Sequence, residues 1–184
     1  MATLARQPMI EPPWLIEARK SIGLHEIPGL KNDPSVMALI DWADGRKDGK
    51  TLSAQNDDEA WCAKAVCAWL EMCGIRSTRS PAARSFGKWG QELDGPAVGS
   101  VVVFWRKSVD SAFGHVGLVV GKDSSGNIVV LGANQQDAVN IKSFTKSRII
   151  AGGFRWPPDR PKPKAGWDTL PLLKSNGEVS KNES

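Results

Sequence analysis

Two residues of this chain, Cys62 and His115, have side chains that together could perform nucleophilic catalysis. Cys62 opens an apolar run that predicts a helix, directly after an acidic stretch at residues 57–59. A thiol in the first turn of a helix is favoured as the thiolate, because the helix dipole and the exposed N–H groups stabilise an anion. His115 stands at the start of a predicted strand, and its imidazole could accept the thiol proton. The pair favours a cysteine hydrolase.

The helical spacing of the residues after Cys62 predicts which side of the helix each cysteine occupies. At 100° per residue, Cys62 and Cys73 fall on the apolar side, and Lys64, Cys67 and Glu71 on a polar side. A free cysteine is commonly an inert packing residue, so its position alone leaves both interpretations of Cys62 open. The presence of His115 favours the catalytic one.

A predicted hairpin suggests which residue orients His115. Turn-forming residues at 122–127 separate two apolar runs, and a turn centred between Ser124 and Ser125 places His115 directly opposite Asn134. An amide at that position would hold one imidazole nitrogen and leave the other for the thiol. A slip or bulge of one residue would substitute Gln135 or Ala133.

The elements expected around these residues predict an α+β fold with helices ahead of a small antiparallel sheet. Helices are expected at 14–22, 34–43 and 62–74, with a less regular one at 81–93, and strands at 100–105, 116–120, 128–131 and 149–154 with a further short one near 138–141. The expected organisation is an N-terminal extension at 1–13, a hydrolase domain at 14–157 and a Pro/Lys-rich tail at 158–184, which is expected to be a flexible appendage or a docking strap.

Composition narrows the function further. The chain has 184 residues and a net charge of +4, but its basic residues are scattered, so no nucleic-acid partner is expected. The three cysteines lie in one predicted helix and are too far apart to bridge, which indicates reduced thiols. Neither a secretory signal nor a membrane-spanning run is visible, so synthesis in the cytoplasm without membrane insertion is expected. No zinc-ligand spacing or phosphate loop occurs, and we expect no metal or organic cofactor.

Several short motifs resemble those of the NlpC- and CHAP-type cell-wall cysteine peptidases and amidases, closest to a branch common in bacteriophage genomes. The resemblance covers residues 14–157. The motifs that carry it are Gly23-x-x-Glu26-x-Pro28-Gly29, Trp61-Cys62, Ser80-x-x-Ala83-Arg84-Ser85, Trp89-Gly90, residues 99–106, Gly114-His115-Val116-Gly117 and Leu131-Gly132-x-Asn134-Gln135. The chain departs from this branch at Ala60, where proline is usual, and at Lys64, where a small residue is usual.

The resemblance implies a papain-like fold and a hydrolase of the amide bonds in peptidoglycan peptides, either an endopeptidase or an N-acetylmuramoyl-L-alanine amidase. It implies Cys62 as nucleophile, His115 as base and Asn134 as third residue. The backbone N–H of Cys62, with Gln55 or Asn56, is expected to stabilise the oxyanion. Trp61 and Gln135 are expected in the substrate groove.

An enzyme of this kind without a signal peptide would act in the periplasm or cell wall as a phage lysin released by a holin, a virion-borne lysin or an effector injected by a secretion apparatus. An injected effector would need a cognate immunity protein in its producer. Three alternatives stay open: a non-catalytic wall-binding or baseplate module on the same fold, a cysteine acyltransferase or deamidase that acts on proteins, and a glycosidase that uses a pair of carboxylates.

Overall fold

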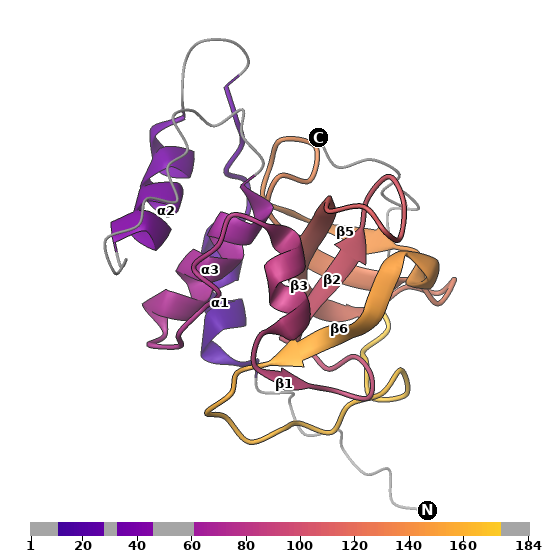
Figure 1. The fold of residues 1–184 in the computed structure, drawn as a ribbon. Helices are drawn as coiled ribbons and strands as arrows, with labels where there is room; N and C mark the ends of the chain where they lie inside the picture. The colour runs from indigo at the N-terminus through magenta and orange to yellow at the C-terminus, as the bar shows by residue number, and fades with distance from the viewer. Residues whose placement is uncertain (1–10, 28–32, 46–60, 174–184) are drawn as a thin grey trace, which may run out of the picture.

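The computed structural model describes residues 11–27, 33–45 and 61–173 and has helices at the N-terminal end and a sheet after them (Figure 1). The helices are α1 (Pro13–Lys20), α2 (Pro34–Gly45) and α3 (Cys62–Met72), and two 3-10 turns follow at η1 (Ala83–Lys88) and η2 (Lys146–Arg148). The three expected helices are therefore present. The less regular helix expected at 81–93 is present only as the 3-10 helix η1, because Gly90 has a φ of 59° and turns the chain into a short strand.

The sheet has six strands in the order β1-β6-β2-β3-β4-β5, and the strand pairs are antiparallel. Their bounds are β1 (Gln91–Glu92), β2 (Val101–Trp105), β3 (Gly114–Lys122), β4 (Ile128–Gly132), β5 (Asn140–Phe144) and β6 (Ile149–Trp156). Mixed helices and an antiparallel sheet agree with the expected α+β class. The strand β1 is the one that the pattern of apolar residues did not indicate, since two residues are too few to show alternation.

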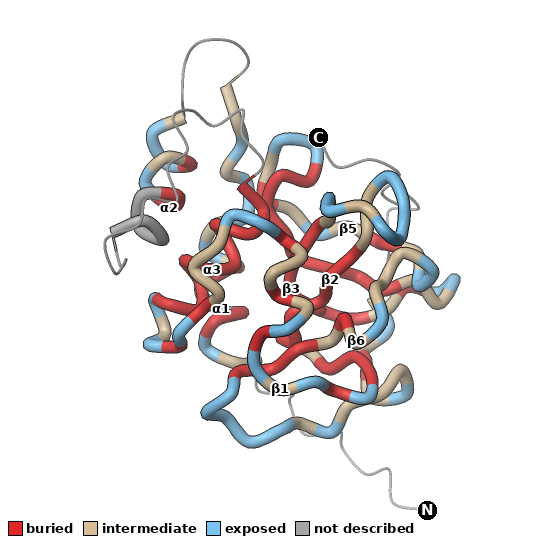
Figure 2. The backbone as a smooth tube through the Cα atoms, in the orientation of Figure 1, coloured by how far each residue is buried: buried red, intermediate tan, exposed pale blue. Residues whose placement is uncertain are grey.

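Alternate residues of the central strands enter two different apolar clusters, one on each face of the sheet. Val101 and Val103 of β2 belong to the cluster that contains α1, α2 and α3. Val102 and Phe104 belong to the second cluster, with Phe144 of β5. Figure 2 shows the buried backbone running through α3 and the middle of the sheet. Both faces are thus buried, which explains the near-continuous apolar runs of β2, β3 and β4.

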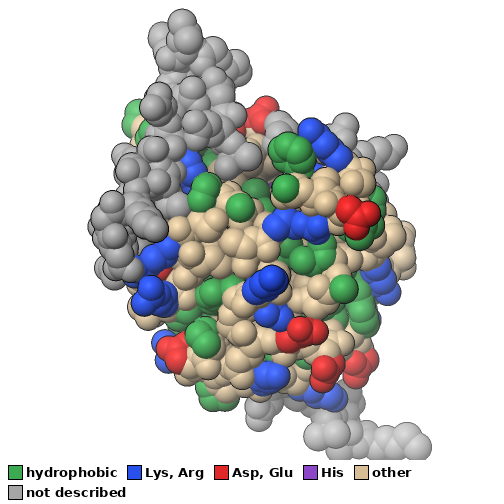
Figure 3. All heavy atoms as spheres, in the orientation of Figure 1, with side chains coloured by type: hydrophobic (Ala, Val, Ile, Leu, Met, Phe, Trp, Pro, Cys, Tyr) green, Lys and Arg blue, Asp and Glu red, His purple; other side chains and the backbone are tan. Residues whose placement is uncertain are grey.

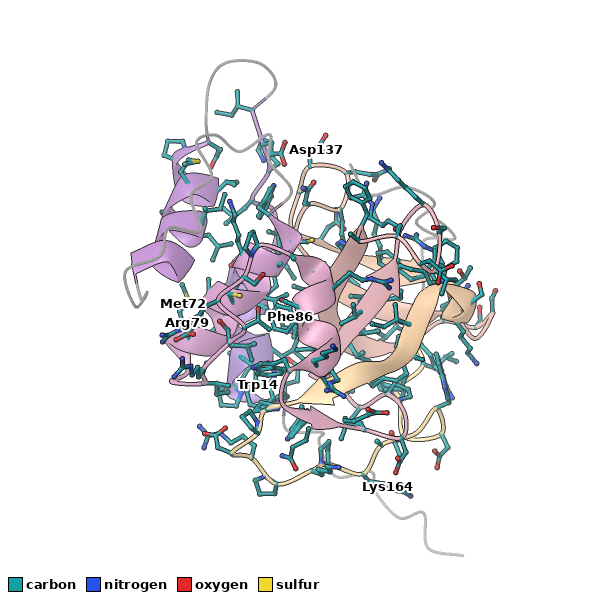
Figure 4. The ribbon with its side chains drawn as sticks, viewed as in Figure 1. Trp14, Met72, Arg79, Phe86, Asp137 and Lys164 are labelled. Carbon is teal, nitrogen blue, oxygen red and sulfur yellow. The ribbon has the colours of Figure 1, made fainter. Side chains whose placement is uncertain are left out.

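Helix α3 is buried from Cys62 to Glu71, on its polar side as well as on its apolar side. Lys64 and Glu71 are each 5% exposed or less, and Cys67 is fully buried. The segment after the helix supplies the reason: the Glu71 carboxylate accepts hydrogen bonds from the Ser77 backbone and hydroxyl and from Arg79. Figure 4 shows Arg79 beside Met72 at the end of this helix. Polar residues of a helix can therefore mark a contact with a polar loop instead of solvent.

Residues 158–173, for which a flexible appendage or a docking strap was expected, pack against the sheet. Backbone hydrogen bonds join Lys122 to Pro171 and Leu173 to Lys122. Leu170 is 2% exposed and completes the second apolar cluster, beside Trp167. The second face of the sheet needs an apolar cover, and an extended proline-rich strap provides it. Within the described residues, no helix is long and apolar enough to cross a lipid bilayer.

Candidate functional site

The best-defined polar arrangement at the end of the sheet surrounds the side chain of Gln135. Its Nε2 group donates to both the backbone oxygen and the Oδ1 atom of Asn140, each at 2.8 Å. Asn140 Nδ2 in turn donates to the backbone oxygen of Gln135 at 2.7 Å. Because both N–H bonds of the Gln135 amide face acceptors, its Oε1 atom must point the other way. That oxygen lies 3.1 Å from Nε2 of His115.

This contact determines which nitrogen of His115 carries the proton in the neutral ring. An amide oxygen can only accept a hydrogen bond, so Nε2 of His115 must carry the proton. In the neutral ring, Nδ1 is then the basic nitrogen. The ring plane is held as well, since it stacks on Phe144 at 5.4 Å between centroids and on Phe104 at 6.2 Å. A fixed tautomer in a fixed plane is what a general base requires.

The strand register explains why Gln135 and not Asn134 meets His115. The pairs Leu118–Leu131 and Val119–Val130 have the register expected from the turn, although the pairs nearest the turn are shifted by one residue. The strand β4, however, ends at Gly132, before the position opposite His115 is reached. Asn134 then adopts a left-handed φ of 54°. Its Oδ1 atom is buried and has no hydrogen-bond partner in the described structure.

The contact between His115 and Gln135 corrects the geometric part of the expectation for Asn134: the amide that holds the imidazole comes from the next residue. One residue in the sequence that relates to this contact is Gly132, because the contact leaves no room for a side chain there. A Cβ at this glycine would lie 2.6 Å from Gln135 Oε1 and 3.2 Å from His115 Nε2. A residue with a side chain would therefore displace the amide oxygen. Asn140 and Phe144, which complete the arrangement, carried no signal that the spacing alone could have shown.

Cys62 is the first residue of α3 and is 5% exposed. The residue before it, Trp61, is the N-cap and makes no side-chain hydrogen bond to the first turn. Helix α3 packs against β3, the strand on which His115 is the second residue. The thiol thus lies where helix N–H groups favour an anion, on an element that contacts the strand of His115.

The other cysteines are placed differently. Cys67 is buried, with its Sγ 3.7 Å from Thr78 Oγ1 and 3.9 Å from the backbone oxygen of Ser80. Cys73 lies at the opposite end of the helix from Cys62, and burial raises its pKa, with a smaller effect in the same direction from the charge of Glu17. Neither thiol shares the features that favour a thiolate at Cys62.

Trp61 is fully buried, and its indole N–H donates to Glu26 at 2.5 Å. The interpretation of this residue as part of a substrate groove therefore receives no support from the structure. Gln55 and Asn56 lie outside the described residues, so their assignment to the oxyanion site stays a prediction. Among residues 11–27, 33–45 and 61–173, no group of three or more His, Cys, Asp and Glu side chains could hold a metal ion.

Charge is spread over the surface that Figure 3 shows, with Lys and Arg side chains interspersed among Asp and Glu. This distribution agrees with the scattered basic residues of the sequence.

In a comparison with known protein families, the CHAP domain model matches residues 54–134. This is less than half of the chain, but it includes Cys62 and His115 and ends at Asn134. CHAP domains are typically cysteine- and histidine-dependent amidohydrolases, so the match suggests a peptidoglycan hydrolase. Searches of curated proteins and of solved structures found no match.

Proposed function

We propose that this chain is a cysteine hydrolase with a papain-like arrangement that cleaves amide bonds in the peptide part of peptidoglycan, as an endopeptidase or an N-acetylmuramoyl-L-alanine amidase. The observation that carries the proposal is the His115–Gln135 contact, because it leaves Nδ1 as the basic nitrogen on the strand against which α3 packs. The CHAP-domain match over residues 54–134 supports the class of substrate.

In the proposed reaction, Nδ1 of His115 takes the proton of the Cys62 thiol, and the thiolate attacks the carbonyl carbon of the substrate amide. The tetrahedral intermediate collapses as the imidazolium returns the proton to the leaving amine. Water, deprotonated by His115, then hydrolyses the thioester and regenerates the thiol. Gln135 holds the imidazole throughout by accepting the Nε2 proton in a hydrogen bond, and this contact is strongest when the ring is positively charged.

Negative charge on the intermediate needs hydrogen-bond donors. The backbone N–H of Cys62 is one candidate, because it belongs to the first turn of α3. Gln55 or Asn56 is proposed as the second. The proposal also includes a route by which the enzyme reaches the cell wall, which is release by a holin, transport on a virion or injection by a secretion apparatus. In the last case the producing cell would need an immunity protein.

The decisive experiment is mass spectrometry of purified peptidoglycan after digestion by the wild type, Cys62→Ala and Cys67→Ser. We expect new fragments from the wild type and from Cys67→Ser and none from Cys62→Ala, and their masses would identify the bond. Cys67→Ser is the matched control, since the serine hydroxyl can keep the contacts with Thr78 and Ser80. Fragments from a folded Cys62→Ala would refute the mechanism. Absence of fragments from the wild type would favour a wall-binding module or a protein substrate.

A further inference from the structure

Glu26 connects two parts of the candidate site that are far apart in the sequence. Its backbone belongs to a short segment that pairs with the loop containing Gln135, and its side chain reaches the residue before Cys62. The proposed reaction gives Glu26 no chemical step, so these contacts require a separate explanation.

The backbone contacts of this segment fasten the loop at 133–139. Glu26 N donates to Asp137 O at 2.8 Å, Val139 N donates to Leu24 O at 2.8 Å, and His25 forms a β-bridge with Ala138. In Figure 4, Asp137 lies at the top of this loop, next to the purple segment of the N-terminal region.

The loop needs such support because three of its residues have left-handed backbones. Asn134, Gln136 and Asp137 have φ values of 54°, 56° and 58°. A left-handed backbone costs a residue with a Cβ about 1 kcal/mol or more, and less for Asn and Asp, so the strain is greatest at Gln136. These turns direct the Gln135 side chain back towards His115. The segment at 23–26 is therefore part of what keeps the amide at the imidazole.

The side chain of Glu26 makes the second connection. Its Oε1 atom accepts the indole N–H of Trp61, which is fully buried and immediately precedes the proposed nucleophile. A buried indole N–H needs an acceptor, and a carboxylate is a strong one. The start of α3 is thus joined through one residue to the loop that orients His115.

We propose that Glu26 is a positioning residue that sets the start of α3, and with it Cys62, relative to the His115–Gln135 unit. The proposal rests on the proposed function, because it assigns Glu26 a purpose in the geometry of that thiol and imidazole. A displacement of about 1 Å between reacting groups can lower a rate by about two orders of magnitude. Loss of the hydrogen bond between Glu26 and Trp61 could therefore slow the reaction by moving Cys62 relative to His115.

The test compares Glu26→Ala, Glu26→Gln and Trp61→Phe with a matched control, Ser21→Ala. Ser21 Oγ accepts a hydrogen bond from the indole N–H of Trp69 at 3.0 Å. Trp69 lies on α3 about two turns after Trp61. The control therefore removes the same kind of bond from α3, away from Cys62. Two readouts are needed: kcat and KM on soluble muropeptides, and the pH profile of Cys62 alkylation by iodoacetamide, followed by peptide mass spectrometry. His115→Ala defines the alkylation profile of a thiol without its base.

We expect Glu26→Ala and Trp61→Phe each to lower kcat about tenfold with little change in KM, and the double variant to lose no more than the single ones. Glu26→Gln should restore kcat, because its amide oxygen still accepts the indole N–H. The alkylation profile of Glu26→Ala should move towards that of His115→Ala, whereas Ser21→Ala should match the wild type in both readouts.

Two results would overturn the proposal. One is a wild-type alkylation profile in Glu26→Ala while His115→Ala is shifted, which would refute the positioning role and leave the proposed function intact. The other is a fall in kcat that is proportional to the loss of thermal stability in both Glu26→Ala and Ser21→Ala. That result would show that the Glu26–Trp61 hydrogen bond only stabilises the fold. An unshifted profile in His115→Ala would instead refute the proposed thiol–imidazole pair itself.

Discussion

The amide oxygen of Gln135 lies 3.1 Å from Nε2 of His115, although the strand that leads towards Gln135 ends three residues earlier, at Gly132. The contact is made by a loop side chain that turns back onto the strand β3. Its orientation follows from the two hydrogen bonds that Gln135 Nε2 donates to Asn140. The imidazole of His115 is therefore held by Gln135, whose side chain is fixed in turn by Asn140. This arrangement makes the assignment of the protonated nitrogen of His115 testable.

Replacing Gln135 should impair catalysis more than replacing Asn134. Gln135→Ala removes the acceptor of the Nε2 proton, and we expect kcat to fall by roughly tenfold to hundredfold. Asn134→Gly keeps the left-handed backbone and removes an amide oxygen that has no hydrogen-bond partner in the described structure, so its loss should be smaller. Steady-state kinetics on muropeptides measure both. A greater loss in Asn134→Gly than in Gln135→Ala would restore Asn134 as the orienting residue.

The neutral ring of His115 should be protonated on Nε2. In Cys62→Ala, which lacks the proposed thiolate and so permits a neutral ring, ¹⁵N chemical shifts at pH 8 should show a protonated Nε2 and an unprotonated Nδ1. The chain has two histidines, and His115→Ala identifies the signals. Gln135→Ala in the same background should give a mixture of tautomers. A protonated Nδ1 in Cys62→Ala would contradict the base assignment.

Leu170 should contribute to the stability of the whole domain, although it lies in the Pro-rich segment that follows the expected hydrolase domain. It is 2% exposed in the second apolar cluster, whereas Leu172 is 65% exposed. We expect Leu170→Ala to lower the free energy of unfolding by about 2–5 kcal/mol and Leu172→Ala to change it by roughly 0.5 kcal/mol or less. Urea unfolding measures the difference. Equal stabilities of the two variants would show that the strap does not cover the sheet in solution.

The Glu71 carboxylate should stabilise the fold at neutral pH and less so in acid. Burial disfavours its charge, but the hydrogen bonds from Arg79 and Ser77 outweigh burial and lower the pKa below the ordinary value of 4.5. The unfolded chain thus binds this proton more readily, so stability from Glu71 is present above about pH 4.5 and is lost as the pH falls through the lowered pKa.

The corresponding experiment is urea unfolding of the wild type and Glu71→Gln at pH 7 and at pH 3. The free energy of unfolding of the variant should be lower than that of the wild type by about 1–3 kcal/mol at pH 7. This difference in the free energy of unfolding should be smaller at pH 3. Glu17→Gln is the control, because its surface pair with Lys20 is worth about 0–1 kcal/mol. A gap that widens in acid would mean that the fold raises the pKa of Glu71 instead of lowering it.

The α+β class and the two candidate catalytic residues could be predicted from local sequence alone. Cys62 at a helix start and His115 at a strand start follow from the periodicity of neighbouring apolar residues, and both elements begin within two residues of the expected positions. The less regular helix expected at 81–93 is shortened to a 3-10 helix for a local reason, since the glycines in that stretch favour turns.

What the tertiary structure decided depends on contacts between distant segments. The register near His115 was correct, yet the end of β4 and the left-handed turn at Asn134 brought Gln135 to the imidazole, and neither can be read from alternation. Likewise, the polar side of α3 is buried because the loop at 75–80 supplies partners for Glu71, and the strap at 158–173 is ordered because the sheet has a second apolar face. A sequence pattern indicates which environment a side chain prefers, apolar or hydrogen-bonding. Which residue provides that environment depends on segments that come together only when the chain folds.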